Sequence, residues 1–157
     1  MSIDRARDYL RKYGEDINIQ VFDNSSATTE EAASCVHDSP SRIAKTLSFR
    51  VSGRIILVVT SGDARVDNSK FKAEFGRRGS MLAHDEVENI IGHAVGGVCP
   101  FGINPDVEIF LDKSISRFDY GYLAAGSSNS LIKLSIPRLE EITHYPKWID
   151  VCNIPQP

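Results

Sequence analysis

A lysine and a glycine-rich loop are the parts of this sequence whose residue types and spacing could do chemistry. Lys45 lies in residues 43–47, where an expected helical turn gives way to an expected strand, and residues 95–102 read VGGVCPFG. Glycine allows close backbone approach, and proline restricts both itself and the preceding residue, so such a loop can hold backbone amides toward one point. We expect a pocket in which a cation and amides face an oxygen-rich ligand. Two simpler interpretations stay open: a solvated lysine at a strand end and a tight crossing between strands.

Other reactive side chains give weaker signals. Cys99 lies in the glycine loop, where amides could lower the pKa of its thiol, but a nucleophile needs a base beside it. The sequence leaves open whether His93 approaches Cys99, and a small apolar residue lining the loop is the favoured interpretation. The four histidines are scattered without His-Glu-x-x-His or another ligand pair, so neither a metal nor a cofactor is expected. Nucleophile-elbow and phosphate-loop motifs are absent, which disfavours serine hydrolases and nucleoside triphosphatases.

The elements that would position these residues alternate irregularly between helix and strand. Thr28 and Glu31 form a capping-box pattern before a short helix, and Asp67 and Asp85 are expected to cap two more helices. For Asp67, substrate contact is the less favoured alternative. Strands are expected at 17–22, 45–51, 55–59, 107–111, 122–125 and 131–136, with a hairpin across residues 52–54. A final helix is expected at 137–142. About six or seven strands and five short helices in this order favour a mixed α+β fold.

Length and composition bound the class of protein. A chain of 157 residues, 41% hydrophobic and 25% charged, predicts a single globular domain over residues 1–157, with a proline-rich tail from 144 that wraps the surface. No apolar run approaches the length of a membrane span and no signal peptide is visible, so no membrane partner and a cytoplasmic location are expected. Three cysteines without paired spacing predict free thiols.

The net charge of −3 excludes a broadly basic surface, so any contact with nucleic acid must come from a local patch. Two clusters are candidates, although each could simply be a solvated face. They are Arg5, Arg7, Arg11 and Lys12, and Lys70, Lys72, Arg77 and Arg78.

Four segments in this order resemble the YbaK and prolyl-tRNA-editing superfamily, whose members are stand-alone relatives of the editing domain inserted in bacterial prolyl-tRNA synthetases. They are residues 32–33, 43–47, 95–102 and 124–127, and the resemblance covers roughly residues 17–143. It implies a barrel-like mixed sheet surrounded by helices. It also implies hydrolysis of the ester of mischarged aminoacyl-tRNA for translation quality control. The partners would be the aminoacyl-tRNA acceptor end and prolyl-tRNA synthetase.

The same resemblance assigns the site. Lys45 matches the principal functional side chain of the family, and the loop matches the segment that contacts the aminoacyl end. The substrate-binding candidates are Gly96, Gly97, Val98, Cys99, Pro100, Phe101, Gly102, Gly126, Ser127 and Asn129. Some alanine-specific members carry a histidine just after the late glycine turn. At this place the present chain has residues 126–130, with Asn129 as a polar substitute. The resemblance therefore does not imply specificity for alanine.

The leading hypothesis is a trans-acting aminoacyl-tRNA deacylase that acts on mischarged tRNA for proline and admits a small amino acid by steric exclusion. The amino acid, the tRNA and the oligomeric state stay open. A non-catalytic module that binds an aminoacyl or nucleotide end is one alternative, and a hydrolase of small amino-acid esters is another.

Overall fold

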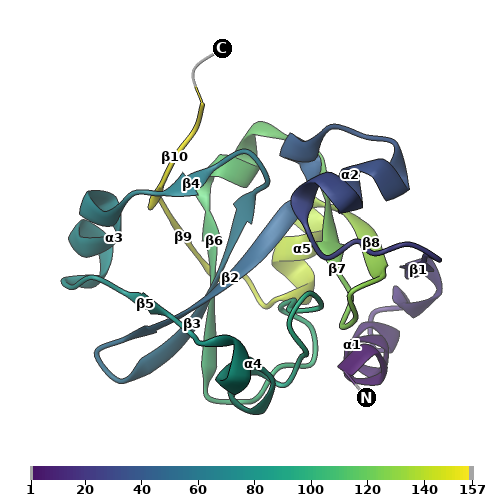
Figure 1. Ribbon diagram of the computed structural model, residues 1–157, viewed down its shortest axis with the longest axis horizontal. Helices are drawn as coiled ribbons and strands as arrows, with labels where there is room; N and C mark the ends of the chain where they lie inside the picture. Colours follow the sequence, from purple (N-terminus) through teal and green to yellow (C-terminus); the bar gives the residue numbers. More distant parts are fainter. Residues whose placement is uncertain (1, 156–157) are drawn as a thin grey trace.

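The computed structural model describes residues 2–155, and these form five α-helices, three 3₁₀ helices and ten strands (Figure 1). The helices are α1 (Ser2–Arg11), α2 (Thr29–Val36), α3 (Asn68–Phe75), α4 (His84–Ile91) and α5 (Ile136–Ile142), with 3₁₀ helices η1 (Asp16–Asn18), η2 (Pro40–Arg42) and η3 (Lys113–Arg117). The strands are β1 (Gln20–Val21), β2 (Ala44–Val51), β3 (Arg54–Ser61), β4 (Arg65–Val66), β5 (Ser80–Met81), β6 (Val107–Asp112), β7 (Tyr120–Ala124), β8 (Ser130–Ser135), β9 (Lys147–Ile149) and β10 (Cys152–Asn153).

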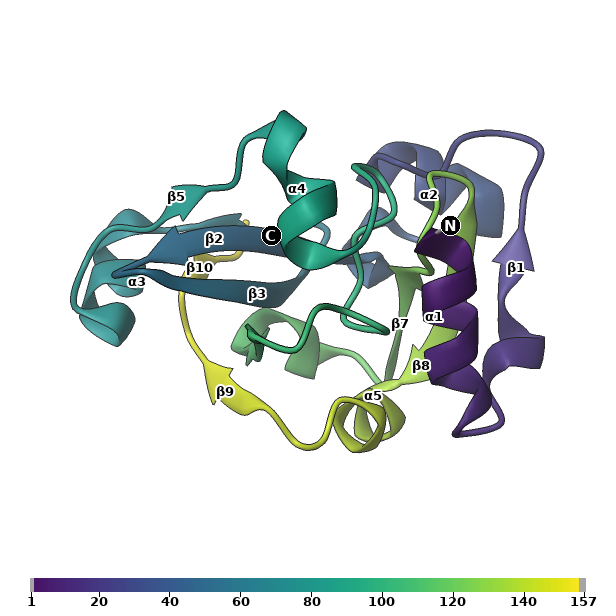
Figure 2. The ribbon, with the colours of Figure 1, turned by 90° about the horizontal axis from the view of Figure 1, so that it is seen from below.

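The central sheet has five strands in the order β5-β2-β3-β6-β9. The predicted hairpin of β2 and β3 is confirmed, with Lys45 opposite Thr60, while β6 pairs parallel to β3 and β9 pairs parallel to β6. The continuous apolar run in β3 fits this position, because strands covered on both faces carry apolar residues throughout. Figure 2 shows α4 and β5 on one side of the hairpin, and α5 with β9 on the other.

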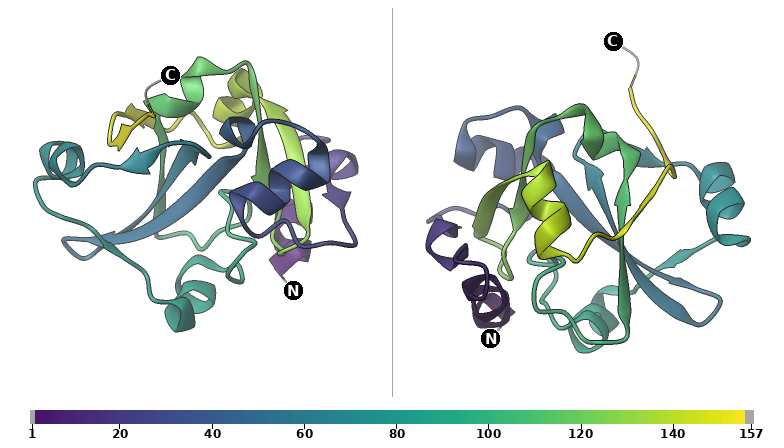
Figure 3. Two further views of the ribbon diagram at one scale, coloured as in Figure 1. Left: turned by 45° about the horizontal axis from the view of Figure 1, so that its top comes forward. Right: turned by 180° about the vertical axis from the view of Figure 1, so that it is seen from behind.

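The other strands form an antiparallel sheet of order β1-β8-β7 and a pair of β4 with β10. A parallel bridge between Ile43 and Tyr122 joins the start of β2 to β7. Helix α2 covers the three-stranded sheet, where Ala32 and Ala33 pack near Tyr122 (Figure 3). The mixed α+β class is therefore confirmed. The sheets are not closed into a barrel, so the expected barrel-like closure is not established.

Local sequence signals place most helices correctly. The capping box of Thr28 and Glu31 is present, and Asp67 caps α3 by accepting a hydrogen bond from the backbone N–H of Lys70. The prediction for Asp85 was wrong, because α4 begins at His84 and its N-cap is Ala83, two residues before Asp85. The Glu86 carboxylate accepts the Ala83 N–H, so this helix needs no side chain at the cap position itself.

Two segments differ from the sequence prediction. The strand expected at 17–22 is reduced to β1, because η1 occupies residues 16–18. The proline-rich tail does more than cover the surface, since it supplies β9 to the central sheet and β10 to β4. Among residues 2–155, no helix is long and apolar enough to cross a membrane, and Cys35, Cys99 and Cys152 are free thiols.

Candidate functional site

A pocket of about 330 Å³ lies along one edge of β2. Its wall combines the approach to α2, the first half of β2, the β5–α4 segment, the glycine loop and the ends of β7 and β8. Most of the lining is apolar. The lining residues are Ser26, Ala27, Thr28, Thr29, Ile43, Ala44, Lys45, Thr46, Leu47, Ser48, Met81, Leu82, His84, Val87, Val95, Gly96, Val98, Ala124 and Leu131.

The pocket exists because β2 has a partner along only one of its edges over most of its length. β3 pairs with all eight residues of β2, whereas β5 pairs only with Phe49 and Arg50 on the opposite edge. Near its start, β2 touches β7 through the bridge at Ile43. The stretch between these two contacts borders the pocket, so Lys45 and Thr46 are both available to a ligand there.

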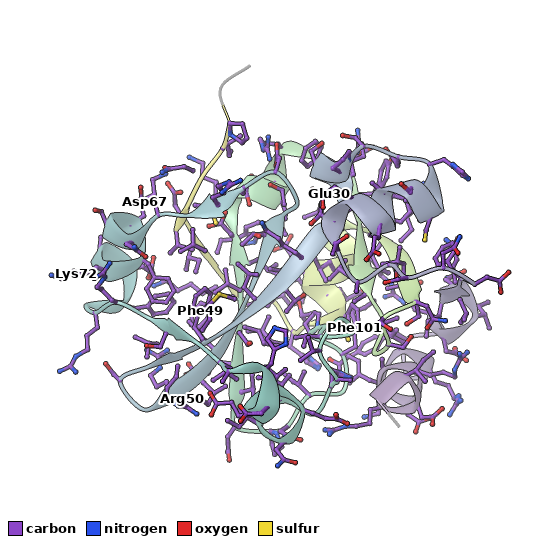
Figure 4. The ribbon with its side chains drawn as sticks, in the orientation of Figure 1. Glu30, Phe49, Arg50, Asp67, Lys72 and Phe101 are labelled. Carbon is purple, nitrogen blue, oxygen red and sulfur yellow. The ribbon has the colours of Figure 1, made fainter. Side chains whose placement is uncertain are left out.

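Lys45 is half-buried, and its Nζ donates a hydrogen bond to the carbonyl oxygen of Ala64 at 2.7 Å. Burial lowers the pKa of this ammonium, and the nearby positive charge of Arg65 acts in the same direction. Cys152 of β10, followed by the negative charges of Asp63 and Glu30, opposes that shift. Figure 4 shows Glu30 on α2, near the start of β2, the strand whose second residue is Lys45. Because an ammonium has three donors, two remain for a ligand.

Thr46 adds a second polar group to the same wall. Its Oγ1 is buried and has no hydrogen-bond partner among residues 2–155. A buried hydroxyl without a partner is costly, so a ligand that hydrogen-bonds to it would gain affinity.

The glycine loop contributes only its first half to the pocket. Gly96 and Val98 line it, whereas Gly97, Cys99, Pro100, Phe101 and Gly102 do not. The N–H of Gly97 is already donated to the carbonyl of Ala94 at 2.9 Å. The amide cradle expected from the sequence is therefore limited to Gly96 and Val98.

The second half of the loop packs into the protein. Phe101 is fully buried in the main core cluster, and Figure 4 shows it in the interior. Gly102 has a φ of +70°, and a Cβ there would lie 2.5 Å from the Arg5 carbonyl oxygen of α1. For these residues, the interpretation as a tight structural crossing describes the geometry better than ligand contact does.

Cys99 does approach His93, with 3.5 Å between its Sγ and the Nε2 of the imidazole. Both residues are fully buried. Burial raises the pKa of the Cys99 thiol to about 12, so the thiol is protonated near neutral pH. These properties suit a small core residue rather than a nucleophile.

The late glycine turn supports the loop from behind. The N–H of Gly126 is donated to the Gly97 carbonyl at 3.1 Å, and a Cβ at Gly97 would lie 2.4 Å from the Ser127 nitrogen. Ser127 donates to the Asn129 side-chain oxygen, and the Asn129 amide donates to the Phe22 carbonyl, each at 2.9 Å. Gly126, Ser127 and Asn129 therefore join the loop to β1 and stay outside the pocket lining.

Comparison with known proteins gives the family. The sequence model of the aminoacyl-tRNA editing domain matches residues 23–142 of this chain. The chain belongs to the aminoacyl-tRNA editing domain family. Its resemblance to YbaK and prolyl-tRNA editing proteins, first indicated by the lysine and glycine motifs, is thereby confirmed.

Relatives of this editing domain include both short and long proteins. "Uncharacterized protein YwhH" of Bacillus subtilis is 44% identical over 154 residues, which is 98% of each chain. A proline–tRNA ligase of Bacillus cytotoxicus is 31% identical over 97 residues, covering 61% of this chain but only 17% of the ligase. A crystal structure of a protein proposed to be a trans-editing enzyme for prolyl-tRNA synthetase superposes with a TM-score of 0.87 at 25% identity, covering 97% of each chain.

The pocket of this editing domain also contains residues that the sequence did not single out. Met81 and His84 flank it from the β5–α4 segment, and Met81 is 62% exposed although it is a large apolar residue. Val95, which is 44% exposed, lies at the glycine loop. No local motif marks these residues, since the β5–α4 segment reaches β2 only through the short pairing at Phe49 and Arg50.

Two further candidates can be placed. Asp67 uses both carboxylate oxygens, one on the Lys70 N–H and one on the Asn153 amide, and it lies outside the pocket lining, in agreement with a structural cap. Within residues 2–155, no group of three or more His, Cys, Asp or Glu side chains is arranged to hold a metal ion.

Proposed function

We propose that this chain is a trans-acting aminoacyl-tRNA deacylase that hydrolyses the ester of mischarged tRNA for proline. The observation that carries the proposal is the shared pocket of Lys45 and Gly96 at the open edge of β2. Membership of the aminoacyl-tRNA editing domain family supports the same class of substrate.

The pocket offers what ester hydrolysis requires. When water attacks the ester carbonyl, the oxygen gains negative charge, and a donor already aimed at that oxygen contributes about 3 kcal/mol in well-studied cases. The two unused N–H groups of Lys45 can bind this oxygen, the ribose hydroxyl or the terminal phosphate. The amides of Gly96 and Val98 are the other candidate donors. Aminoacyl esters are already reactive, so correct placement of water and carbonyl supplies much of the acceleration.

Selection of a small amino acid would come from the apolar part of the wall. Val87, Val98 and Leu131 line the pocket, and the first two belong to or pack against the buried cluster under α4. Because a packed wall resists expansion, an amino acid with a larger side chain would overlap with it sterically. Such exclusion separates amino acids more effectively than small differences in binding affinity do.

The tRNA backbone would be held by the cluster Lys72, Arg77 and Arg78. These side chains are exposed and make no ion pair or hydrogen bond with any of residues 2–155. Figure 4 shows Lys72 at the outer side of α3. Arg78 precedes Met81 of the pocket wall by three residues, a span of about 10 Å of extended chain. Phosphates close to the aminoacyl end could therefore reach this cluster.

The cluster of Arg5, Arg7, Arg11 and Lys12 suits this role less well because three of its four charges make contacts within the protein. Arg5 donates to the Gly92 carbonyl and to the Asn104 side chain, and Arg11 pairs with Asp8 at 2.8 Å. Lys12 lies over the Tyr9 ring.

The test is a panel of tRNAs charged with correct and incorrect amino acids, with ester loss followed over time. We expect loss of a small non-cognate amino acid from tRNA for proline, while correctly charged prolyl-tRNA persists. Hydrolysis of no member above the buffer rate would refute the proposal. Binding without turnover would favour an aminoacyl-end binding module instead, and equally rapid cleavage of free amino-acid esters would favour a small-ester hydrolase.

A further inference from the structure

The segment after α5 lies outside the span matched by the editing-domain family, which ends at residue 142. It nevertheless runs back across the molecule and pairs β10 antiparallel with β4, with Cys152 opposite Val66 and Asn153 opposite Arg65 (Figures 1 and 3). β4 begins directly after Ala64, whose carbonyl accepts the hydrogen bond from Lys45. The tail is thus connected to the candidate catalytic lysine through the pairing of β10 with β4 and through the Ala64 carbonyl that precedes β4.

Hydrogen bonds beyond the strand pairing fix the tail to this region. The Val151 carbonyl accepts the Asp67 N–H at 2.8 Å, and the Asn153 amide donates to the Asp67 carboxylate at 2.7 Å. Lys70 donates its Nζ to the Cys152 carbonyl at 2.9 Å. Asp67 and Lys70 both follow Ala64 by only a few residues.

The start of the tail strand is also anchored in the core. Val151 is fully buried and donates its N–H to the buried carboxylate of Asp112 at 2.8 Å. A backbone bond to a buried carboxylate is strong and costly to break. β10 therefore lies at a defined position relative to β6, which ends at Asp112.

The turn that presents Ala64 is held from its other side by different contacts. Arg117 donates to Ser61 at 2.7 Å and to Asp63 at 2.6 Å. Gly62 lies so close to η2 that a Cβ there would be 2.1 Å from the Pro40 carbonyl oxygen. The Ala64 N–H also donates to the Ser61 carbonyl at 3.1 Å, so these contacts hold the turn up to Ala64, while the stretch that follows Ala64 pairs with β10.

We propose that β10 is a positioning element for Lys45, because by holding β4 it fixes the Ala64 carbonyl that orients the lysine ammonium at the pocket wall. The catalytic consequence rests on the proposed deacylase function, whereas the effect on the lysine itself does not. Without β10, the Ala64 carbonyl would move with a loosely held β4, and Lys45 would become more hydrated. A misplacement of about 1 Å at a catalytic group is enough to reduce the rate markedly.

The experiment compares three variants of the chain. The first ends after Val151 and keeps its contact with Asp112, and the second is Asn153→Pro, which removes a backbone N–H of β10 in the full-length chain. The control is Lys147→Ala, which breaks the ion pair of 2.9 Å to Glu74 in the same tail without touching β10. Circular dichroism and thermal melting establish that each variant is folded.

Two readouts are measured for each variant. The pKa of Lys45 is obtained from the pH dependence of its reaction with an amine-reactive label, located by mass spectrometry, and kcat and KM are measured on the preferred mischarged tRNA. We expect Asn153→Pro, which keeps Cys152, to shift the pKa of Lys45 upward toward that of a free lysine, and both β10 variants to lower kcat/KM by about tenfold or more. The truncation also removes Cys152, whose interaction with Lys45 raises the pKa of the lysine, so the pKa readout is decided by Asn153→Pro. Lys147→Ala should leave both readouts at the parental values.

Parental values of the pKa and of kcat/KM in Asn153→Pro would overturn the proposal, and so would a parental kcat/KM in the truncated chain if it folds. A truncated chain that unfolds leaves the decision to Asn153→Pro. If the parent hydrolyses no aminoacyl-tRNA, the deacylase function fails, but the Lys45 labelling still decides whether β10 positions the lysine.

Discussion

The Nζ of Lys45 donates a hydrogen bond of 2.7 Å to the carbonyl oxygen of Ala64, a residue that lies nineteen positions further along the chain. Ala64 is almost fully buried, so the acceptor lies in the packed interior, and the strand that follows it is paired with β10. The contact uses one of the three ammonium donors for orientation and leaves two for a ligand. An orienting carbonyl of this kind reduces the entropy that a long lysine side chain would otherwise lose on binding.

We first predict that Lys45→Met lowers kcat/KM on the preferred mischarged tRNA by about 100-fold, the loss typical of one stabilising donor. Methionine keeps most of the apolar stem and removes the charge. Lys45→Arg should rescue little, because a planar guanidinium cannot place its donors as an ammonium does. The control is Lys113→Met, which removes an exposed lysine outside the pocket lining. Parental turnover by Lys45→Met would exclude the ammonium from the mechanism.

A second prediction concerns pH. Burial lowers the pKa of Lys45, so the ammonium is lost at a lower pH than that of an ordinary lysine, 10.5. After subtraction of spontaneous ester hydrolysis, enzymatic turnover should therefore decline on the alkaline side before that value. The unfolded chain binds this proton more tightly than the folded chain, so the contribution of Lys45 to the free energy of unfolding increases as pH rises through the lowered pKa. Denaturant titrations of the parent and Lys45→Met across this range measure that difference.

The sequence predicted those parts of the fold that local signals determine. The capping box at Thr28 and Glu31 and the hairpin of β2 and β3 depend on neighbouring residues, and both are present. β5 and β10 have two residues each and exist only through pairing with distant strands, so no periodicity could reveal them. Without these long-range pairings, the sequence predicts only that the tail wraps the surface.

The same distinction applies to the site. Lys45 and Gly96 line one pocket, and a family resemblance can indicate such a pairing because it carries information about tertiary contacts. Resemblance could not separate the half of the loop that faces the pocket from the half that fills the core, since burial of Cys99 depends on packing with other elements. His84 gave no signal because its place in the pocket follows from the short β5 pairing.

A third prediction tests the contact between the glycine loop and the late glycine turn. Gly97→Ala would place a Cβ 2.4 Å from the Ser127 nitrogen and 2.5 Å from the Gly126 carbonyl carbon, so backbone must move. We expect a loss of about 1–3 kcal/mol in the free energy of unfolding, as for other overpacked sites. In Gly121→Ala, the matched control, the nearest contact would be 3.3 Å and the loss smaller. Equal stability of the two variants in denaturant titrations would contradict the tight crossing.

The fourth prediction separates Cys99 from catalysis. Because burial raises its pKa to about 12, Cys99→Ala should keep parental kcat on mischarged tRNA. The variant should lose about 1 kcal/mol of stability through the small cavity left in the core. Thiol reagents should modify Cys99 in the native protein far more slowly than the partly exposed Cys35. A large fall in kcat with an unchanged melting temperature would instead assign Cys99 a chemical role.

The last prediction concerns the free cations at the corner between α3 and β5. Replacement of Lys72, Arg77 and Arg78 by glutamine should weaken the binding of full-length tRNA and make this binding less dependent on salt. The slope of the logarithm of the binding constant against the logarithm of the salt concentration should become shallower by about one for each phosphate that the variant no longer neutralises. The control removes three positive charges elsewhere, through Arg7→Gln, Lys12→Gln and Lys113→Gln. Hydrolysis of an aminoacyl-adenosine fragment, which lacks the flanking phosphates, should be the same in the parent and both triple variants. An equal loss of tRNA binding in both triple variants would mean that only the overall charge matters, whereas a selective loss in the first would place the RNA backbone beside Met81.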